Sequence, residues 1–166
     1  MNTKTSKKVT IIALIFLILC TAFVLALLFT GTLSASVKTS EDMDEGIAIG
    51  CTGAVIVIVF LFTLIVKGLS IIFGVSSLFV KRKLSSILVL GVLTCILAIV
   101  SLICSVYCLV IFQDIQNGSP SALLMNSGLI LAVVSDIAWL GSIIFNTIVI
   151  SKTLKALPDE EVSKIV

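Results

Sequence analysis

The sequence predicts an all-α integral membrane protein, folded as an antiparallel up-down bundle of four transmembrane helices. Three observations predict this fold class. Apolar runs cover about residues 9–36, 47–80, 84–112 and 121–150 of the 166; 59% of the residues are hydrophobic and 12% charged, and the mean hydropathy is +1.31. Each run exceeds the roughly 20 apolar residues that a helix needs to cross a hydrocarbon core of about 30 Å. Because backbone groups in lipid must bond within their own segment, and because the runs do not alternate, barrel strands are excluded.

The first run follows a basic head that contains Lys4, Lys7 and Lys8. A basic head before an apolar stretch also occurs in signal peptides, but their apolar region has only about 7 to 15 residues. The first run is longer, so we expect it to be retained as a transmembrane helix.

Charge placement predicts the orientation of the four helices. Basic residues occupy the head, the second connection (Lys81, Arg82 and Lys83) and the segment after the fourth run (Lys152 and Lys155). The other two connections are mainly acidic. The first has Lys38 against Glu41, Asp42, Asp44 and Glu45, and the third has Asp114. Short loops rich in Lys and Arg stay on the cytoplasmic side. We therefore expect both termini in the cytoplasm, and a location in the plasma membrane.

The segments outside the four runs are short, and the longest is a cytoplasmic tail at 151–166. None is long enough to fold as a separate domain, so residues 1–166 form a single membrane domain. Short connections place consecutive helices side by side in opposite directions.

Two ionisable side chains of opposite sign interrupt the apolar runs, Lys67 in the second and Asp136 in the fourth. A charge at the centre of a bilayer costs at least about 2.5 to 3.5 kcal/mol, so such residues are candidates for function. Counted from Lys81 and Lys152, they lie roughly 21 and 24 Å from the cytoplasmic markers along straight helices. They can form an intramembrane charge pair at one depth.

Two other interpretations of Lys67 remain open. The twenty apolar residues 47–66 suffice to cross the membrane, so Lys67 can instead extend its ammonium to the inner interface. It can also serve with Asp136 in transport or proton relay. Asp136 is too short to reach the headgroups, so its partner must come from another helix or from water.

The five cysteines all fall within the apolar runs. Their simplest interpretation is as small buried side chains. Cys51 and Cys108, however, each lie four residues from the non-cytoplasmic end of their run, so a disulfide between them is a possibility.

Small residues recur at four-residue spacing, a pattern found where transmembrane helices pack closely. The pairs are Gly46 with Gly50, Ser70 with Gly74, Ser101 with Ser105, and Ala138 with Ser142. Packing within the chain explains all of them.

Motifs for chemistry are missing from the sequence. It has no histidine, no Gly-rich phosphate loop and no paired catalytic carboxylates, so we expect no enzyme activity, no cofactor and no metal site. The basic turn is too small to bind nucleic acid, and few polar groups are available to line a path through the membrane.

The sequence therefore predicts a small non-enzymatic multi-pass protein that acts through intramembrane contacts, as an accessory subunit, a regulator or an immunity-type protector. Its expected partners are the lipid bilayer and another membrane protein, or further copies of itself in a homo-oligomer. The alternative is an oligomeric small transporter or channel that uses Lys67 and Asp136.

Overall fold

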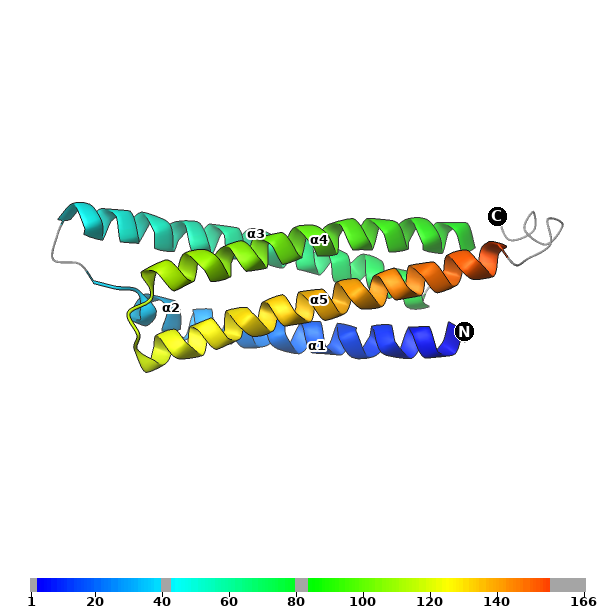
Figure 1. Ribbon diagram of the computed structural model, residues 1–166, viewed down its shortest axis with the longest axis horizontal. Coiled ribbons are helices and arrows are strands. Elements are labelled where there is room, and N and C mark those ends of the chain that lie inside the picture. The colour runs from blue at the N-terminus through cyan, green and yellow to red at the C-terminus, as the bar shows by residue number, and fades with distance from the viewer. Residues whose placement is uncertain (1–2, 40–42, 80–83, 156–166) are drawn as a thin grey trace.

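The protein is all-helical in the computed structural model, which describes residues 3–39, 43–79 and 84–155 (Figure 1). Its helices are α1 (Thr3–Phe29), α2 (Thr32–Ser36), α3 (Met43–Phe79), α4 (Leu84–Ile115) and α5 (Pro120–Lys155). The basic turn at 81–83 and the tail from 156 lie outside the described residues.

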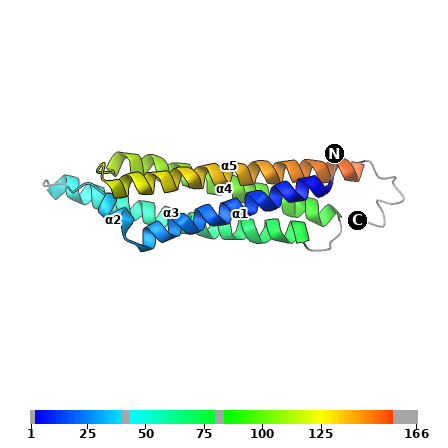
Figure 2. The same ribbon diagram turned by 90° about the horizontal axis from the view of Figure 1, so that it is seen from below.

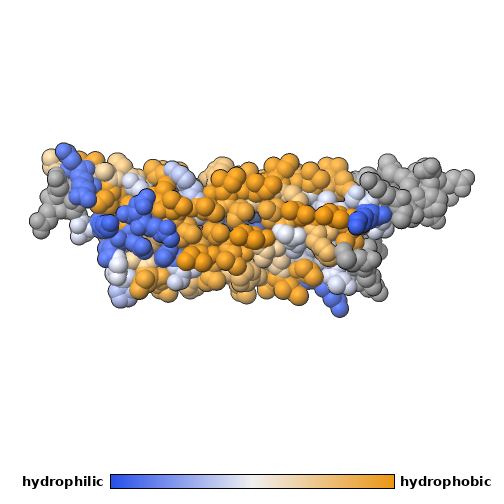
Figure 3. All heavy atoms as spheres, in the orientation of Figure 1, coloured by the Kyte–Doolittle hydropathy of each residue, from blue (hydrophilic) through white to orange (hydrophobic). Residues whose placement is uncertain are grey.

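Four of these helices are long and apolar enough to cross a membrane: Thr5–Phe29, Met43–Ser77, Ser86–Ile115 and Pro120–Thr153. Apolar side chains cover the middle of the face in Figure 3, and hydrophilic side chains gather toward both ends. The chain is a multi-pass membrane protein, as the run lengths predicted.

The first apolar run is not one helix to residue 36, and this part of the prediction is wrong. Gly31 has a φ of 72°, in the left-handed region, and it separates α1 from the short α2. Glycine reaches this conformation without the steric penalty of a Cβ, so it ends the helix although the sequence around it stays apolar.

Buried positions follow one spacing in all four long helices. They alternate between three and four residues: Ser6, Thr10, Ala13, Leu17, Cys20, Val24 and Leu27 in α1; Ile56, Phe60, Thr63, Lys67, Ser70, Gly74 and Ser77 in α3; Gly91, Thr94, Ala98, Ser101, Ser105, Cys108, Phe112 and Ile115 in α4; Ala122, Met125, Leu129, Ala132, Asp136, Trp139, Ile143 and Asn146 in α5. This is the heptad spacing of left-handed helix packing. Many of these buried residues are small or polar, while large aliphatic residues cover the outside.

The helices pack in the order α1, α5, α4, α3, and α1 hardly touches α3. The start of α1 lies beside the end of α5, where Ser6 Oγ donates to Asn146 Oδ1 at 2.8 Å. At the other end of this pair, Gly128 of α5 lies against Leu27 and Val24. We name the end with the start of α1 and the end of α5 the terminal end, and the opposite one the loop end (Figure 1).

Two connections are tied together at the loop end. Val37 and Gln116 form an isolated antiparallel bridge. Asn117 donates through Nδ2 to the carbonyls of Ala35 and Val37, at 3.0 and 3.3 Å. These bonds hold α2 against the start of α5.

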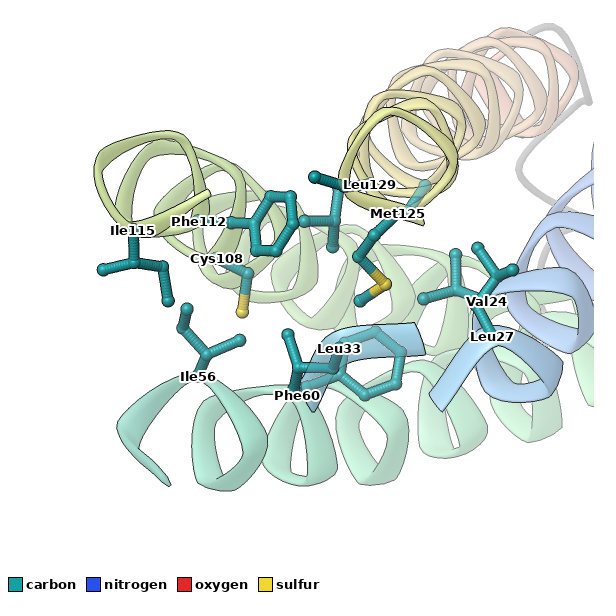
Figure 4. Close-up of a cluster of buried hydrophobic side chains, with 12 residues drawn as sticks. Val24, Leu27, Leu33, Ile56, Phe60, Cys108, Phe112, Ile115, Met125 and Leu129 are labelled. Carbon is teal, nitrogen blue, oxygen red and sulfur yellow. The ribbon is translucent and has the colours of Figure 1, made fainter. Parts of the chain in front are cut away.

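An apolar cluster fills the interior toward the loop end (Figure 4). It includes Phe60 of α3, Phe112 of α4 and Met125 and Leu129 of α5, with Leu33 of α2 beside them. A smaller cluster around Trp139 lies nearer the terminal end. Between these clusters the interior is polar.

Trp139 sets the spacing between α3 and α5 near the second cluster. Its Nε1 donates to Ser70 Oγ at 2.9 Å, and a Cβ built on Gly74 would lie 2.5 Å from Trp139 Cζ2. The small residue at 74 is therefore required by the indole ring, and the spacing of Ser70 and Gly74 predicted this close approach.

We expect Gly74→Ala to destabilise the bundle by about 1 to 3 kcal/mol, because the added methyl group overlaps the indole ring. Gly68→Ala is the matched control: no atom lies within 4 Å of its added Cβ, and alanine favours the helix by up to about 1 kcal/mol. Reversible SDS unfolding in micelles measures both variants. Equal stability of the two would contradict this packing.

Candidate functional site

The structure brings the two intramembrane charges into contact. Lys67 Nζ lies 3.1 Å from Asp136 Oδ2. Two hydroxyl groups of α4 complete the site: Ser105 Oγ donates to Asp136 Oδ2 at 2.6 Å, and Ser101 Oγ donates to Oδ1 at 3.2 Å. Three helices therefore meet at one carboxylate.

Heptad positions of α3, α4 and α5 supply all four residues. Ser101 and Ser105 are one turn apart on α4, so both hydroxyls point to the same side and reach the two oxygens of one carboxylate. The backbones of α3 and α5 hardly approach each other, and the length of the lysine side chain spans the distance between them.

Protein surrounds the pair on all sides. Lys67 is 3% exposed and Asp136 is 1% exposed. Each carboxylate oxygen of Asp136 has at least one protein donor. Such a pair needs complementary hydrogen bonds to offset the cost of burying two charges, and the serines provide them.

The placement of Lys67 decides between the sequence interpretations. Helix α3 continues through Lys67 and Gly68 to Phe79. The Lys67 ammonium is buried against Asp136 and does not extend outward, so the interpretation of Lys67 as an interfacial anchor is wrong. A count of apolar residues alone could not distinguish a span that ends at Val66 from a longer helix with a buried charge. Asp136 takes its partners from other helices, as its short side chain required.

The small size and spacing of Ser101 and Ser105 predicted close helix packing. The sequence alone did not identify their role as donors to Asp136. Their four-residue spacing on one face was the available signal, since it is also the spacing that places two hydroxyls beside one buried carboxylate.

The structure does not join Cys51 to Cys108. Both are free thiols, and Cys51 is exposed whereas Cys108 is buried. In Figure 4 the residue of α3 that lies toward Cys108 is Ile56. Because α3 begins beyond the end of α4 at the loop end (Figure 1), counting from the two run ends placed Cys51 at the wrong level.

Polar groups other than the charge pair are also buried inside the bundle. Between the pair and the terminal end, buried hydroxyl groups occur on every long helix, for example Thr10, Ser77, Thr94 and Ser142. Each of these donates to a carbonyl of its own helix, three or four residues back. These hydroxyls lie among a majority of buried apolar side chains and are satisfied locally.

Two asparagines of α5, Asn146 and Asn126, differ in their hydrogen bonding. Asn146 Oδ1 accepts from Ser6 of α1. The Oδ1 atom of Asn126 is buried and has no hydrogen-bond partner. Within the described residues, no group of three or more His, Cys, Asp or Glu side chains could hold a metal ion.

Comparison with protein-family models, with curated proteins and with solved structures finds no match.

We expect Lys67→Met or Asp136→Leu alone to destabilise the protein strongly, by about 3 to 5 kcal/mol, because each leaves one charge buried without its partner. The double variant should recover most of this loss, and a double-mutant cycle by SDS unfolding measures the coupling. Ser127→Ala is the control, since its hydroxyl is exposed and bonds only its own helix. A harmless Lys67→Met would contradict the buried pair.

Proposed function

We propose that this multi-pass membrane protein is non-enzymatic and acts by binding another membrane protein within the bilayer, as an accessory subunit, a regulator or an immunity-type protector. The observation that carries the proposal is the enclosure of the charge pair. Both charges and both serine hydroxyls bond one another inside the bundle. The polar groups best suited to bind a substrate are thus occupied in holding α3, α4 and α5 together.

The local bonding of the buried hydroxyl groups supports the same proposal. A hydroxyl that donates to its own helix offers little to a passing ion or proton. The buried hydroxyl groups are thus already bonded within the described bundle, and large apolar side chains such as Ile12 and Ile58 are exposed on its outside.

We propose an antiparallel up-down topology with both termini on the cytoplasmic side of the plasma membrane, and a single membrane domain. Residues early in α1 meet residues late in α5, as Ser6 and Asn146 do, while Val24 meets Gly128. These contacts support opposite directions for the two helices. The cytoplasmic assignment of the terminal end depends on the placement of Lys and Arg.

A second candidate is the oligomeric transporter or channel. The favouring observation is an asymmetry of the interior: buried polar residues lie beside the smaller Trp139 cluster from the charge pair to the terminal end, whereas the larger apolar cluster fills the loop end. Such an interior could become a half-path from the cytoplasm to Asp136 if the helices separate.

Single cysteines in a Cys-free background test the topology. A cysteine in place of exposed Asp114 should react with an impermeant maleimide on intact cells, whereas one in place of exposed Lys152 should react only after permeabilisation. Reaction at 152 on intact cells would contradict the orientation.

Reconstitution separates the two functions. The purified protein in liposomes should give no proton or cation flux above that of empty vesicles, and in its native membrane it should migrate on native gels as part of a larger complex. The control is the Lys67→Met, Asp136→Leu double variant, which should give the same result as the unchanged protein in both assays. A flux that Asp136→Asn abolishes would overturn the proposal in favour of transport.

A further inference from the structure

The outward face of α1 carries a cation at the head of a row of apolar side chains. Lys8 is exposed, and Ile12, Ile15 and Leu19 are each more than half exposed. These four residues are spaced by four, three and four positions, so they lie on one side of the helix, opposite its buried positions. Exposed Thr5 adds a hydroxyl group one turn before Lys8.

No other described helix covers this face. In Figure 1, α1 runs along the lower edge of the bundle, and Figure 2, which is seen from below, shows it in front of the other helices. It packs mainly on α5 and hardly touches α3. The row of apolar side chains is therefore open to the surrounding membrane.

Lys8 has no acidic neighbour within the described part of the chain. Of the four acidic residues that the structure describes, Asp136 belongs to the internal charge pair, and the other three lie at the loop end, namely Asp44, Glu45 and Asp114. Lys7, next to Lys8, is also exposed and adds a second positive charge. The terminal end of α1 therefore offers its positive charge to an anion from outside the described chain.

The depth of Lys8 indicates which anion this is. Lys8 lies within Thr5–Phe29, the segment of α1 that is long and apolar enough to cross a membrane. A lysine in the second turn of such a helix extends its ammonium to the headgroups, while the residues that follow contact acyl chains. Ile15 lies seven residues beyond Lys8, roughly 10 Å along the helix. A cation followed by an apolar row matches an anionic headgroup followed by its acyl chain.

We propose that this face of α1 binds one anionic phospholipid, with the phosphate at Lys8 and Thr5 and an acyl chain along Ile12, Ile15 and Leu19. Electrostatic attraction to the ammonium selects the anionic headgroup over a neutral one. The apolar row then holds the chain of the same molecule, which a free phosphate ion or an acidic peptide does not possess. This site lies on the outside of α1, so it is independent of the charge pair and of the proposed function.

Quenching of tryptophan fluorescence by brominated lipids tests this site. Ile15→Trp places a reporter in the apolar row, and Trp139, at 1% exposure, contributes a constant background. The variant is reconstituted in vesicles of phosphatidylcholine and phosphatidylglycerol, with bromine on the acyl chains of one lipid or of the other. The ratio of the two quenching values gives the local ratio of the two lipids. Ile130→Trp is the control reporter, because Ile130 is exposed on α5 and far from any lysine of that helix.

We expect phosphatidylglycerol to be enriched at least about threefold over its bulk fraction at the Ile15 reporter, and less so as salt is raised. It should show no enrichment at the Ile130 reporter. Lys8→Gln should abolish the enrichment, and Lys8→Arg should retain it. Lys38→Gln is the matched control for net charge, since Lys38 is exposed at the loop end, and it should have no effect.

Equal enrichment at the two reporters would overturn the proposal, because it would reflect the overall charge of the protein and not a site. An equal loss in Lys38→Gln and Lys8→Gln would have the same meaning. Glycerophosphoglycerol, which is the headgroup without acyl chains, should not displace the lipid at millimolar concentration. If it does, the site binds free phosphate esters and the apolar row has no part in it.

An acidic segment of the chain is the remaining competitor for Lys8. Asp159, Glu160 and Glu161 belong to the tail outside the described residues. A triple variant with Asp159→Asn, Glu160→Gln and Glu161→Gln should leave the enrichment at the Ile15 reporter unchanged. A rise of twofold or more would make the tail the partner of Lys8 and overturn the lipid site.

Discussion

The contact between Lys67 and Asp136 fixes the arrangement of three of the four membrane helices. Water cannot solvate a charge in the hydrocarbon core, so each of these side chains must find its partner inside the protein. Helices α3 and α5 lie diagonally, with hardly any backbone approach, and the pair spans that diagonal at 3.1 Å. One turn further on, Trp139 of α5 reaches Ser70 of α3 across the same diagonal. The depth of the charges therefore sets the register in which the neighbouring contacts can form.

Unlike a soluble protein, the bundle exposes large apolar side chains over its surface, and it buries polar side chains among apolar ones. Between helices in lipid there is no hydrophobic drive, so close packing and hydrogen bonds must supply the association energy. This explains why many buried positions carry Ser, Thr, Gly or Ala, while most isoleucine side chains face outward. Side chains such as Ile12, Ile58 and Ile103 are more than half exposed, and in a membrane they contact acyl chains rather than water.

The sequence predicted the helical spans well and the interior poorly, for one physical reason. Run length alone identifies a spanning helix, because the bilayer thickness is fixed. The spacing of the buried residues within each run could not be recognised in the sequence, since the usual contrast between an apolar inside and a polar outside is absent in lipid. Small and hydroxyl residues at spacings of three and four, such as Ser101 and Ser105, were the readable signal. The break at Gly31 and the position of Cys51 along the bundle both depend on where the helices begin and end. Apolar composition does not mark those ends.

The open side of the bundle follows from the same constraint. Helix α1 is held by α5 through small residues, and α3 is held by α4 and by the charge pair, so neither needs the other for stability. Apolar side chains line the seam between them, among them Leu28 of α1 and Leu61 of α3, and Leu33 and Ser34 of α2 lie beside it near the loop end. The proposed association through the apolar surface follows from this internal pairing of charge.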